Sequence, residues 1–139
     1  MIKVHTRKQV MYSLDIGSEH PDFCSSHPAI ELLSQEVSKV VGGCTLIDCI
    51  GLWADVERAD RLKYDDVEVG VESNVQLQVK AEVPKEQDVE LSIVETLVLI
   101  SQKWPELGIN WVCGHKVTKE GLTVSFNFST DENKLRGTD

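Results

Sequence analysis

The sequence predicts one α+β domain in which two helices pack on one face of a mostly antiparallel sheet. The expected order is the ferredoxin-like β-α-β-β-α-β with an extra C-terminal strand. The chain has 139 residues, which fits one domain and is long enough for a hydrophobic core. Two segments space their apolar residues as helices do, and the segments around them alternate apolar and polar residues. We therefore treat residues 1–139 as a single domain.

The first strand is predicted over Val4–Ile16, because apolar residues occupy alternate positions in its second half. A loop rich in Ser and Pro follows. A helix is expected after it, with Ser26 as N-cap and Pro28 in the first turn. Its apolar stripe consists of Ile30, Leu33, Val37, Val40 and Val41. Gly42-Gly43 is expected to end this helix.

The second strand is predicted over Cys44–Trp53, where both alternations are apolar apart from Thr45 and Asp48. That pattern predicts a strand covered on both faces, or one that meets a partner. The charged segment Asp55–Glu68 is expected to form an excursion or an irregular hairpin tip. The third strand, Val69–Val83, alternates most clearly and ends before Pro84.

The second helix is expected to begin with Asp88 as its cap and to end at Pro105 and Gly108. Its predicted stripe consists of Leu91, Val94, Leu97, Val98 and Trp104. Two short strands follow, Asn110–His115 and Leu122–Phe128, joined by a turn at Lys119-Glu120-Gly121. The inward residues of the last strand are expected to be Leu122, Val124, Phe126 and Phe128. Residues 130–139 are polar and are expected to form a flexible tail.

Charge excludes some classes of partner. Asp and Glu total 23 against 14 Lys and Arg, a net charge of −9 that repels nucleic acid and anionic lipid. No signal peptide or membrane-spanning stretch is visible, which predicts a cytoplasmic protein. The four cysteines are expected to be free, buried thiols, and Cys44 and Cys49 lie in an apolar run.

The residues Gly43-Cys44-Thr45 and Gly51-Leu52-Trp53 form a pattern on the second strand. It resembles the Gly-x-Thr…Gly-x-Trp signature of a family of small, uncharacterised ferredoxin-like proteins. The Glu-x-Ser/Thr element of that family is only approximated by Glu72-Ser73-Asn74. The resemblance covers roughly Met11 to His115 in layout. It implies the ferredoxin-like fold and no known activity. Members are often exported, whereas this chain shows no signal.

Cysteine and histidine residues offer a candidate metal site. The set His20, Cys24, His27, Cys113 and His115 could supply tetrahedral zinc ligands, although the spacing matches no finger or ribbon. A loop with solvated histidines is the favoured interpretation, and no metal or other cofactor is expected. The pairs Cys113–His115 and Cys24–His27 lack an evident orienting acid, so no catalytic residue is predicted. No phosphate-binding loop or dinucleotide fingerprint is present.

The sheet face away from the helices is the most informative surface. The side chains expected there are Arg7, Gln9, Met11 and Ser13, then Gln76, Gln78 and Lys80, then Thr123, Ser125 and Asn127. They are mostly neutral hydrogen-bonding groups, with two cations. Such a face could bind a polar planar ligand with an anionic group, since amides pair with base edges and Arg suits phosphate. It could also be a face on which protomers stack, or plain solvent-facing sheet.

The predicted ligand-binding residues are Arg7, Gln9, Ser13, Trp53, Gln76, Gln78 and Lys80. Trp53 could stack a ligand ring at the sheet edge, or it could pack against the charged excursion. The predicted function is a non-enzymatic, homo-oligomeric binder of a small anionic or nucleotide-like molecule. In general character the chain resembles phage-encoded proteins that sequester the nucleotide signals of bacterial immunity. The alternatives are an acidic interaction module that uses Asp55–Glu68, and a small Cys/His metal-dependent hydrolase.

Overall fold

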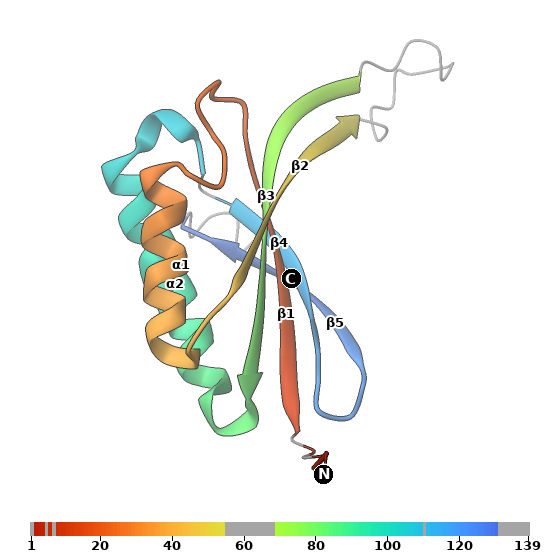
Figure 1. Cartoon of the computed structure of the whole chain (residues 1–139). Helices are drawn as coiled ribbons and strands as arrows, with labels where there is room; N and C mark the ends of the chain where they lie inside the picture. The colour runs from red at the N-terminus through yellow and green to blue at the C-terminus, as the bar shows by residue number, and fades with distance from the viewer. Residues whose placement is uncertain (1, 5, 7, 55–68, 110, 131–139) are drawn as a thin grey trace.

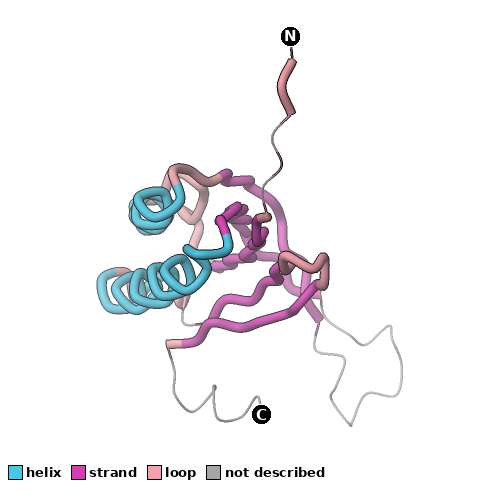
Figure 2. Tube along the Cα trace, turned by 90° about the horizontal axis from the view of Figure 1, so that it is seen from below, coloured by secondary structure: helices cyan, strands magenta, loops and turns pink. Residues whose placement is uncertain are grey.

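A five-stranded antiparallel sheet carries both helices on one face, as predicted (Figures 1 and 2). The computed structural model describes residues 2–4, 6, 8–54, 69–109 and 111–130. The strands lie in the order β2-β3-β1-β4-β5. With β5 left aside, this is the predicted ferredoxin-like arrangement, in which the first and third strands are central neighbours.

Each predicted helix and strand is present, with shifted ends. The strands are β1 Gln9–Ser18, β2 Thr45–Ala54, β3 Val69–Glu82, β4 Trp111–Val117 and β5 Thr123–Ser129. The helices are α1 Pro28–Val41 and α2 Glu86–Lys103. Strand β1 begins at Gln9 instead of Val4, because its partner β3 ends at Glu82, the residue opposite Gln9. Within the described residues, no helix is both long and apolar enough to cross a membrane.

The core lies between the two helices and the sheet. Strands β1 and β3 contribute Val10, Tyr12, Leu14, Ile16, Val75, Leu77, Val79 and Ala81. The helices contribute Ile30, Leu33, Val37, Val89, Ile93, Leu97 and Ile100. Every second residue of β1, and of β3 from Val75 to Ala81, is therefore buried against the helices, and the residues between them lie on the other face.

Helix α1 follows the prediction except at its cap. The N-cap is His27, whose Nδ1 accepts a hydrogen bond from the Ala29 N–H at 3.0 Å. The predicted cap, Ser26, instead has its hydroxyl 3.0 Å from the Cys24 sulfur. Pro28 begins the helix, and the N–H of Gly42 donates to the Ser38 carbonyl where the helix ends. The cap is displaced by one residue because an imidazole nitrogen can serve as the acceptor that Ser26 was expected to supply.

The predicted stripe of α2 is largely wrong. Helix α2 begins at Glu86 after a short 3-10 turn, and Asp88 lies in its first turn without being the cap. The buried residues are Val89, Ile93, Thr96, Leu97 and Ile100. The predicted Leu91, Val94 and Val98 are instead exposed. Apolar residues occur around much of this helix, so spacing alone permits more than one stripe.

Strand β2 was predicted to be covered on both faces or to meet a partner; the first alternative is wrong, and the second stays a prediction. Among the described strands it pairs with β3 alone, so it lies at the edge of the sheet. Ile50 and Leu52 are 74% and 69% exposed, and Cys49 is exposed as well, although the thiol is free as expected. The far half of the β2–β3 hairpin extends away from the helices, so neither helix covers it (Figure 1).

The loop before α1 is attached to the β2 edge through Asp48. Its carboxylate accepts hydrogen bonds from the Ser25 N–H at 2.7 Å and the Ser25 hydroxyl at 2.6 Å. These bonds lower the pKa of Asp48 below its ordinary value. The segment 55–68, predicted as an excursion, lies outside the described residues, as do residues 131–139 of the predicted tail.

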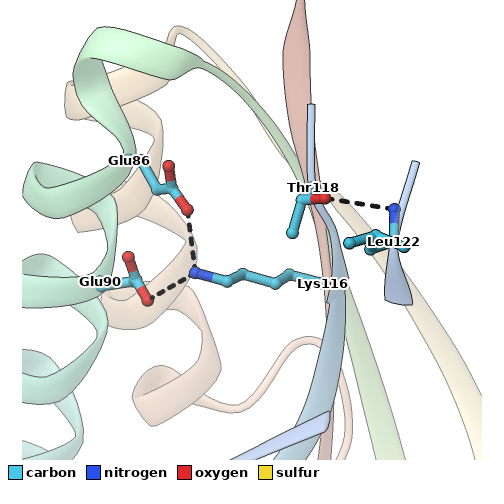
Figure 3. Close-up of polar contacts among 5 residues, drawn as sticks. All are labelled: Glu86, Glu90, Lys116, Thr118 and Leu122. Carbon is cyan, nitrogen blue, oxygen red and sulfur yellow. Dashed lines mark hydrogen bonds and ion pairs between the residues drawn. The ribbon is translucent and has the colours of Figure 1, made fainter. Parts of the chain in front are cut away.

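The β4–β5 hairpin differs in part from the prediction. Phe126 and Phe128 pack against the core, while Leu122 and Val124, also expected inward, are 65% and 42% exposed. The helices do not extend over the turn end of this hairpin (Figure 1). At that turn the Leu122 N–H donates to the Thr118 hydroxyl at 3.2 Å (Figure 3).

Lys116 connects β4 to α2. Its Nζ lies 2.9 Å from Glu86 Oε1 and 3.4 Å from Glu90 Oε1 (Figure 3). It also lies 5.9 Å from the centre of the Tyr12 ring. The hydrogen bond to Glu86 raises the pKa of Lys116, and burial raises the pKa of the Tyr12 hydroxyl, with a further contribution from Glu90.

Replacing Lys116 by methionine is expected to lower the free energy of unfolding by about 1–3 kcal/mol, because two half-buried carboxylates lose their shared cation. Urea unfolding at neutral pH measures this. The matched control is Lys39→Met, whose pair with Glu36 is exposed and should change stability by less than about 0.5 kcal/mol. Because the pKa of Lys116 is raised in the folded state, its contribution is complete below the ordinary lysine value and is lost as pH rises through the folded value. Equal losses of stability in Lys116→Met and Lys39→Met at neutral pH would contradict the larger contribution expected of Lys116.

Candidate functional site

The sheet face away from the helices, here called the open face, contains most of the predicted ligand residues. Residues Gln9, Met11, Ser13 and Asp15 of β1 alternate with buried ones, as do Gln76, Gln78 and Lys80 of β3. Glu72 and Asn74 continue the same alternation of β3 and share this face. In the β1–β3 register Met11 lies opposite Lys80, Ser13 opposite Gln78 and Asp15 opposite Gln76. The structure therefore places the predicted Gln9, Ser13, Gln76, Gln78 and Lys80 on one surface.

A shallow hollow of about 340 Å³ lies on the open face where β1, β3 and β2 meet. The open-face residues that line it are Met11, Ser13, Thr45, Gln78 and Lys80. Three of them, Ser13, Gln78 and Lys80, belong to the predicted ligand set. Thr45 comes from β2, where it pairs with Gln78. The hollow thus brings a cation, an amide and two hydroxyl groups together.

A chain of amide hydrogen bonds leads away from this hollow. Gln78 Nε2 donates to Gln76 Oε1 at 3.0 Å, and Gln76 Nε2 donates to Asp15 Oδ1 at 3.2 Å. The carboxylate of Asp15 fixes the direction of both bonds, because it can only accept when ionised. The two amides are therefore held in defined orientations across β3 and β1.

An acidic end of the open face was missed by the sequence prediction. The Glu72 and Asn74 side chains lie over Gly17, where a Cβ would overlap them, and the Asn74 amide also lies over Gly51. With its amide turned to satisfy both of its neighbours, Asn74 donates to Glu72 Oε1 at 3.2 Å. The alternation of Val69–Val83 could have placed Glu72 and Asn74 on the open face. Their close approach to Gly17 and Gly51 depends on pairing across strands, which the alternation does not give.

Strands β4 and β5 extend the open face. Cys113 pairs with Asp15 on one side and with Asn127 on the other, and His115 pairs with Ser13 and Ser125. A second hollow of about 320 Å³ lies here, lined in part by Asp15, Cys113, His115 and Asn127. The predicted Thr123, Ser125 and Asn127 alternate in step with these residues and share this face.

Two predicted ligand residues cannot be placed. Arg7 lies outside the described residues, and the side chain of Trp53 is not described, although its backbone belongs to β2. A broad depression of about 600 Å³ between α1 and the β2 edge contains none of the predicted residues. The described ligand candidates therefore gather at the open face alone.

The predicted zinc set does not come together. In the part of the chain that the structure describes, no three His, Cys, Asp or Glu residues form a group that could hold a metal ion. His20 Nδ1 accepts a hydrogen bond from the Asp22 N–H, and His27 caps α1. Burial, and then the negative charge of Asp15, raise the pKa of the Cys113 thiol, which disfavours the reactive thiolate.

Comparison with known proteins extends only to the fold. The chain is similar to a phage SAM lyase solved in complex with S-methyl-5'-thioadenosine, with a TM-score of 0.59 and 7% identity, covering 94% of this chain and 96% of that one. The apo form of a phage SAM lyase has a TM-score of 0.60 and 6% identity, and the match covers 94% of this chain and 98% of that one. The B. subtilis GlnK–ATP complex has a TM-score of 0.42 and 14% identity, and the match covers 86% of this chain and 84% of that one. No family model and no curated protein matches the chain, so the Gly-x-Thr…Gly-x-Trp resemblance stays a prediction.

Proposed function

We propose that this protein is a non-enzymatic, homo-oligomeric binder of a small adenosine derivative, which it holds on the open face. The observation that carries the proposal is the hollow in which Lys80, Gln78 and Ser13 converge. The proposed ligand class, adenosine derivatives, is narrower than the predicted class of small anionic or nucleotide-like molecules. Sequestering a nucleotide signal, as some phage proteins do, is one use of such binding.

The amides support an adenine-containing ligand. A carboxamide can donate to and accept from one edge of adenine at the same time, which makes Gln and Asn its usual partners. Gln78 lines the hollow, and its amide is oriented through Gln76. The similarity in fold to a phage protein solved with an adenosine thioether, over nearly the full length of both chains, adds support for this class.

Lys80 supports an anionic group on the same ligand. Its side chain is exposed at the hollow, opposite Met11. An ammonium group can pair with a carboxylate or a phosphate. The opposite end of the open face carries Asp15 and Glu72 and is unsuited to an anion. We therefore place the anionic group at Lys80 and the base toward Gln78.

Isothermal titration with two related probes tests this placement. S-adenosylmethionine carries an adenine and a carboxylate, and S-methyl-5'-thioadenosine carries the adenine without an anionic group. Gln78→Ala is expected to weaken both by at least about fivefold, because the two hydrogen bonds of its carboxamide to the adenine edge are lost. Lys80→Ala is expected to weaken S-adenosylmethionine by about tenfold or more and the thioether hardly at all. ATP, titrated in parallel, distinguishes a phosphate from a carboxylate at Lys80.

Lys39→Ala is the matched control, because Lys39 is an exposed cation beside the depression at α1. Its affinity for each probe should equal that of the native chain. The proposal fails if no adenosine derivative binds. The placement of the two groups fails if Lys80→Ala weakens both probes equally.

A second candidate function is cleavage of S-adenosylmethionine. It is favoured by the carboxylates of Asp15 and Glu72 on the open face, which could attract a sulfonium cation. As the carbon–sulfur bond to the aminobutyrate chain of S-adenosylmethionine breaks, the carboxylate of that chain bonds to the same carbon and closes a lactone. The electron pair of the broken bond goes to sulfur and releases the neutral thioether. Chromatography of the incubated mixture detects that product. Its formation by the native chain, and its loss in Glu72→Gln with binding retained, would replace simple binding with catalysis.

The other two alternatives gain no support. The acidic interaction module was predicted on Asp55–Glu68, which lies outside the described residues, so it stays a prediction. The Cys/His hydrolase lacks a metal-holding group among the described residues. The raised pKa of the Cys113 thiol also disfavours a cysteine nucleophile.

A further inference from the structure

Asp15, Gln76 and Gln78 form a chain of hydrogen bonds on the open face, here called the amide relay. The carboxylate of Asp15 accepts from Gln76 Nε2 at 3.2 Å, and Gln76 Oε1 accepts from Gln78 Nε2 at 3.0 Å. An ionised carboxylate only accepts hydrogen bonds, so it requires the Nε2 end of Gln76 to face it. The Oε1 end of Gln76 then faces Gln78 and requires the Nε2 end of that amide in turn. Asp15 therefore sets the orientation of Gln78, a residue that it does not touch.

The last amide of the relay presents one donor and one acceptor to the hollow. Gln78 lines the hollow, and one N–H of its Nε2 is used by Gln76. Within the described residues, the Gln78 side chain makes no other hydrogen bond. Its second N–H and its Oε1 are free to pair with a ligand. Because the Nε2 end points toward Gln76, the donor lies on the side near Gln76 and the acceptor lies on the far side.

The other polar side chains of the hollow impose no such order. The hydroxyl groups of Ser13 and Thr45 rotate, so each can donate or accept. The ammonium group of Lys80 only donates, and it suits the anionic group of a ligand. Among these open-face residues, Gln78 is the one that offers a donor and an acceptor in a fixed arrangement. The base of a ligand is therefore read by Gln78.

We propose that Asp15 is a positioning residue that makes the hollow select adenine over 6-oxopurines such as hypoxanthine. The inference rests on the proposed function and deepens it. A base outside a duplex can be read on its Watson–Crick edge. In adenine that edge donates from the 6-amino group and accepts at N1, which matches the Oε1 and the free N–H of the oriented amide.

Hypoxanthine presents the reverse pattern on the same edge. Its 6-oxo group accepts and its N1–H donates, so the oriented Gln78 amide would set acceptor against acceptor and donor against donor. Turning the amide over would restore the match with the base. The Oε1 of Gln78 would then face the Oε1 of Gln76, and Gln76 cannot turn in response because its Nε2 is held by Asp15. The relay thus opposes the one movement that would accommodate hypoxanthine.

Isothermal titration with two thioethers that differ only in the base tests the relay. The probes are S-methyl-5'-thioadenosine and its hypoxanthine counterpart, S-methyl-5'-thioinosine. Neither carries a sulfonium or an anionic group, so cleavage and the pairing at Lys80 do not enter the comparison. The native chain is expected to bind the adenine compound about tenfold or more tightly, the discrimination that a matched bidentate amide pair provides.

Asp15→Asn is expected to remove this preference. An asparagine amide at position 15 can either accept from Gln76 or donate to it, so both directions of the relay become available. The affinities for the two compounds should then lie within about twofold of each other. Asp15→Ala, which leaves Gln76 without an anchor, should give the same result. Asp88→Asn is the matched control, because it makes the same change in the first turn of α2, and it should keep the native preference.

The double variant Asp15→Asn/Gln76→Glu moves the carboxylate one step along the relay. The new carboxylate at position 76 only accepts, so it requires the Nε2 end of Gln78 to face it, as in the native chain. The new amide at position 15 can donate to that carboxylate. The net charge equals that of the native chain, and the preference for the adenine compound is expected to return to about tenfold.

The outcomes separate this inference from the proposed function. Equal affinities of the native chain for the two compounds would overturn the inference and leave binding of a purine nucleoside standing. A preference that persists in Asp15→Asn and Asp15→Ala, or one that does not return in the double variant, would do the same. A native chain that binds neither compound would overturn the proposed function, and the inference with it.

Discussion

Replacing Gly114 by alanine is expected to lower the free energy of unfolding by about 3 kcal/mol, the upper end of the usual range for overpacking. Gly114 lies in the middle of β4, opposite Leu14 of β1 and Phe126 of β5. A Cβ there would overlap the Ser13 carbonyl oxygen and lie 3.1 Å from Phe126 Cζ. The carbonyl belongs to the backbone of a central strand and cannot move aside without breaking its pairing.

Gly17→Ala is the matched control for this prediction. The three atoms nearest to a Cβ at Gly17 belong to the ends of the Glu72 and Asn74 side chains, which can rotate away. Its loss of stability is expected to stay within about 1 kcal/mol, close to that of an ordinary surface change. Urea unfolding followed by circular dichroism compares the two. If both variants lose equally little, β4 can shift against β1 and the close packing at Gly114 is not required.

The second large effect is expected at Leu14. Leu14→Ala should lower the free energy of unfolding by about 3 kcal/mol, within the range measured for fully buried leucines. Leu14 is 0% exposed on the central strand β1, between Leu77 of β3 and Gly114 of β4. Because Gly114 has no side chain to relax into the space, the cavity stays largely open.

Met11→Ala is the control on the same strand. Met11 is 48% exposed and lies on the open face, so its truncation removes little buried area and leaves no enclosed cavity. Chemical denaturation of both variants at one pH measures the difference. Losses of similar size at Leu14 and Met11 would contradict the placement of the core on the helix side of β1.

The strand predictions succeeded where one face is buried. In β1 and β3 the alternation identified the buried residues and, by subtraction, the open face, because the side-chain period of a strand fixes both faces at once. The prediction failed for most of the α2 stripe, because apolar residues surround much of that helix and spacing alone does not select the buried face. For β2 the apolar pattern permitted cover on both faces or contact with a partner, and the first alternative is wrong because the strand lies at the sheet edge.

The candidate site was predictable in part for the same reason. Ser13, Gln78 and Lys80 could be placed on one face from their positions in β1 and β3, and they meet in one hollow. Thr45 joins them through the register of β2, which no local pattern reveals. The contact of Glu72 and Asn74 with Gly17 and Gly51 also requires the strand order, so the acidic end of the face was missed.

Amide NMR of the native chain titrated with S-adenosylmethionine tests binding at the open face most directly. If the ligand occupies the hollow, the shifted amides are expected to cluster at Met11–Ser13, Thr45 and Gln78–Lys80, because these residues line the hollow. The amides along the middle of α1 and α2, on the other side of the sheet, should stay unchanged. Shifts confined to the helices, or no shifts with any adenosine derivative, would contradict the proposed function.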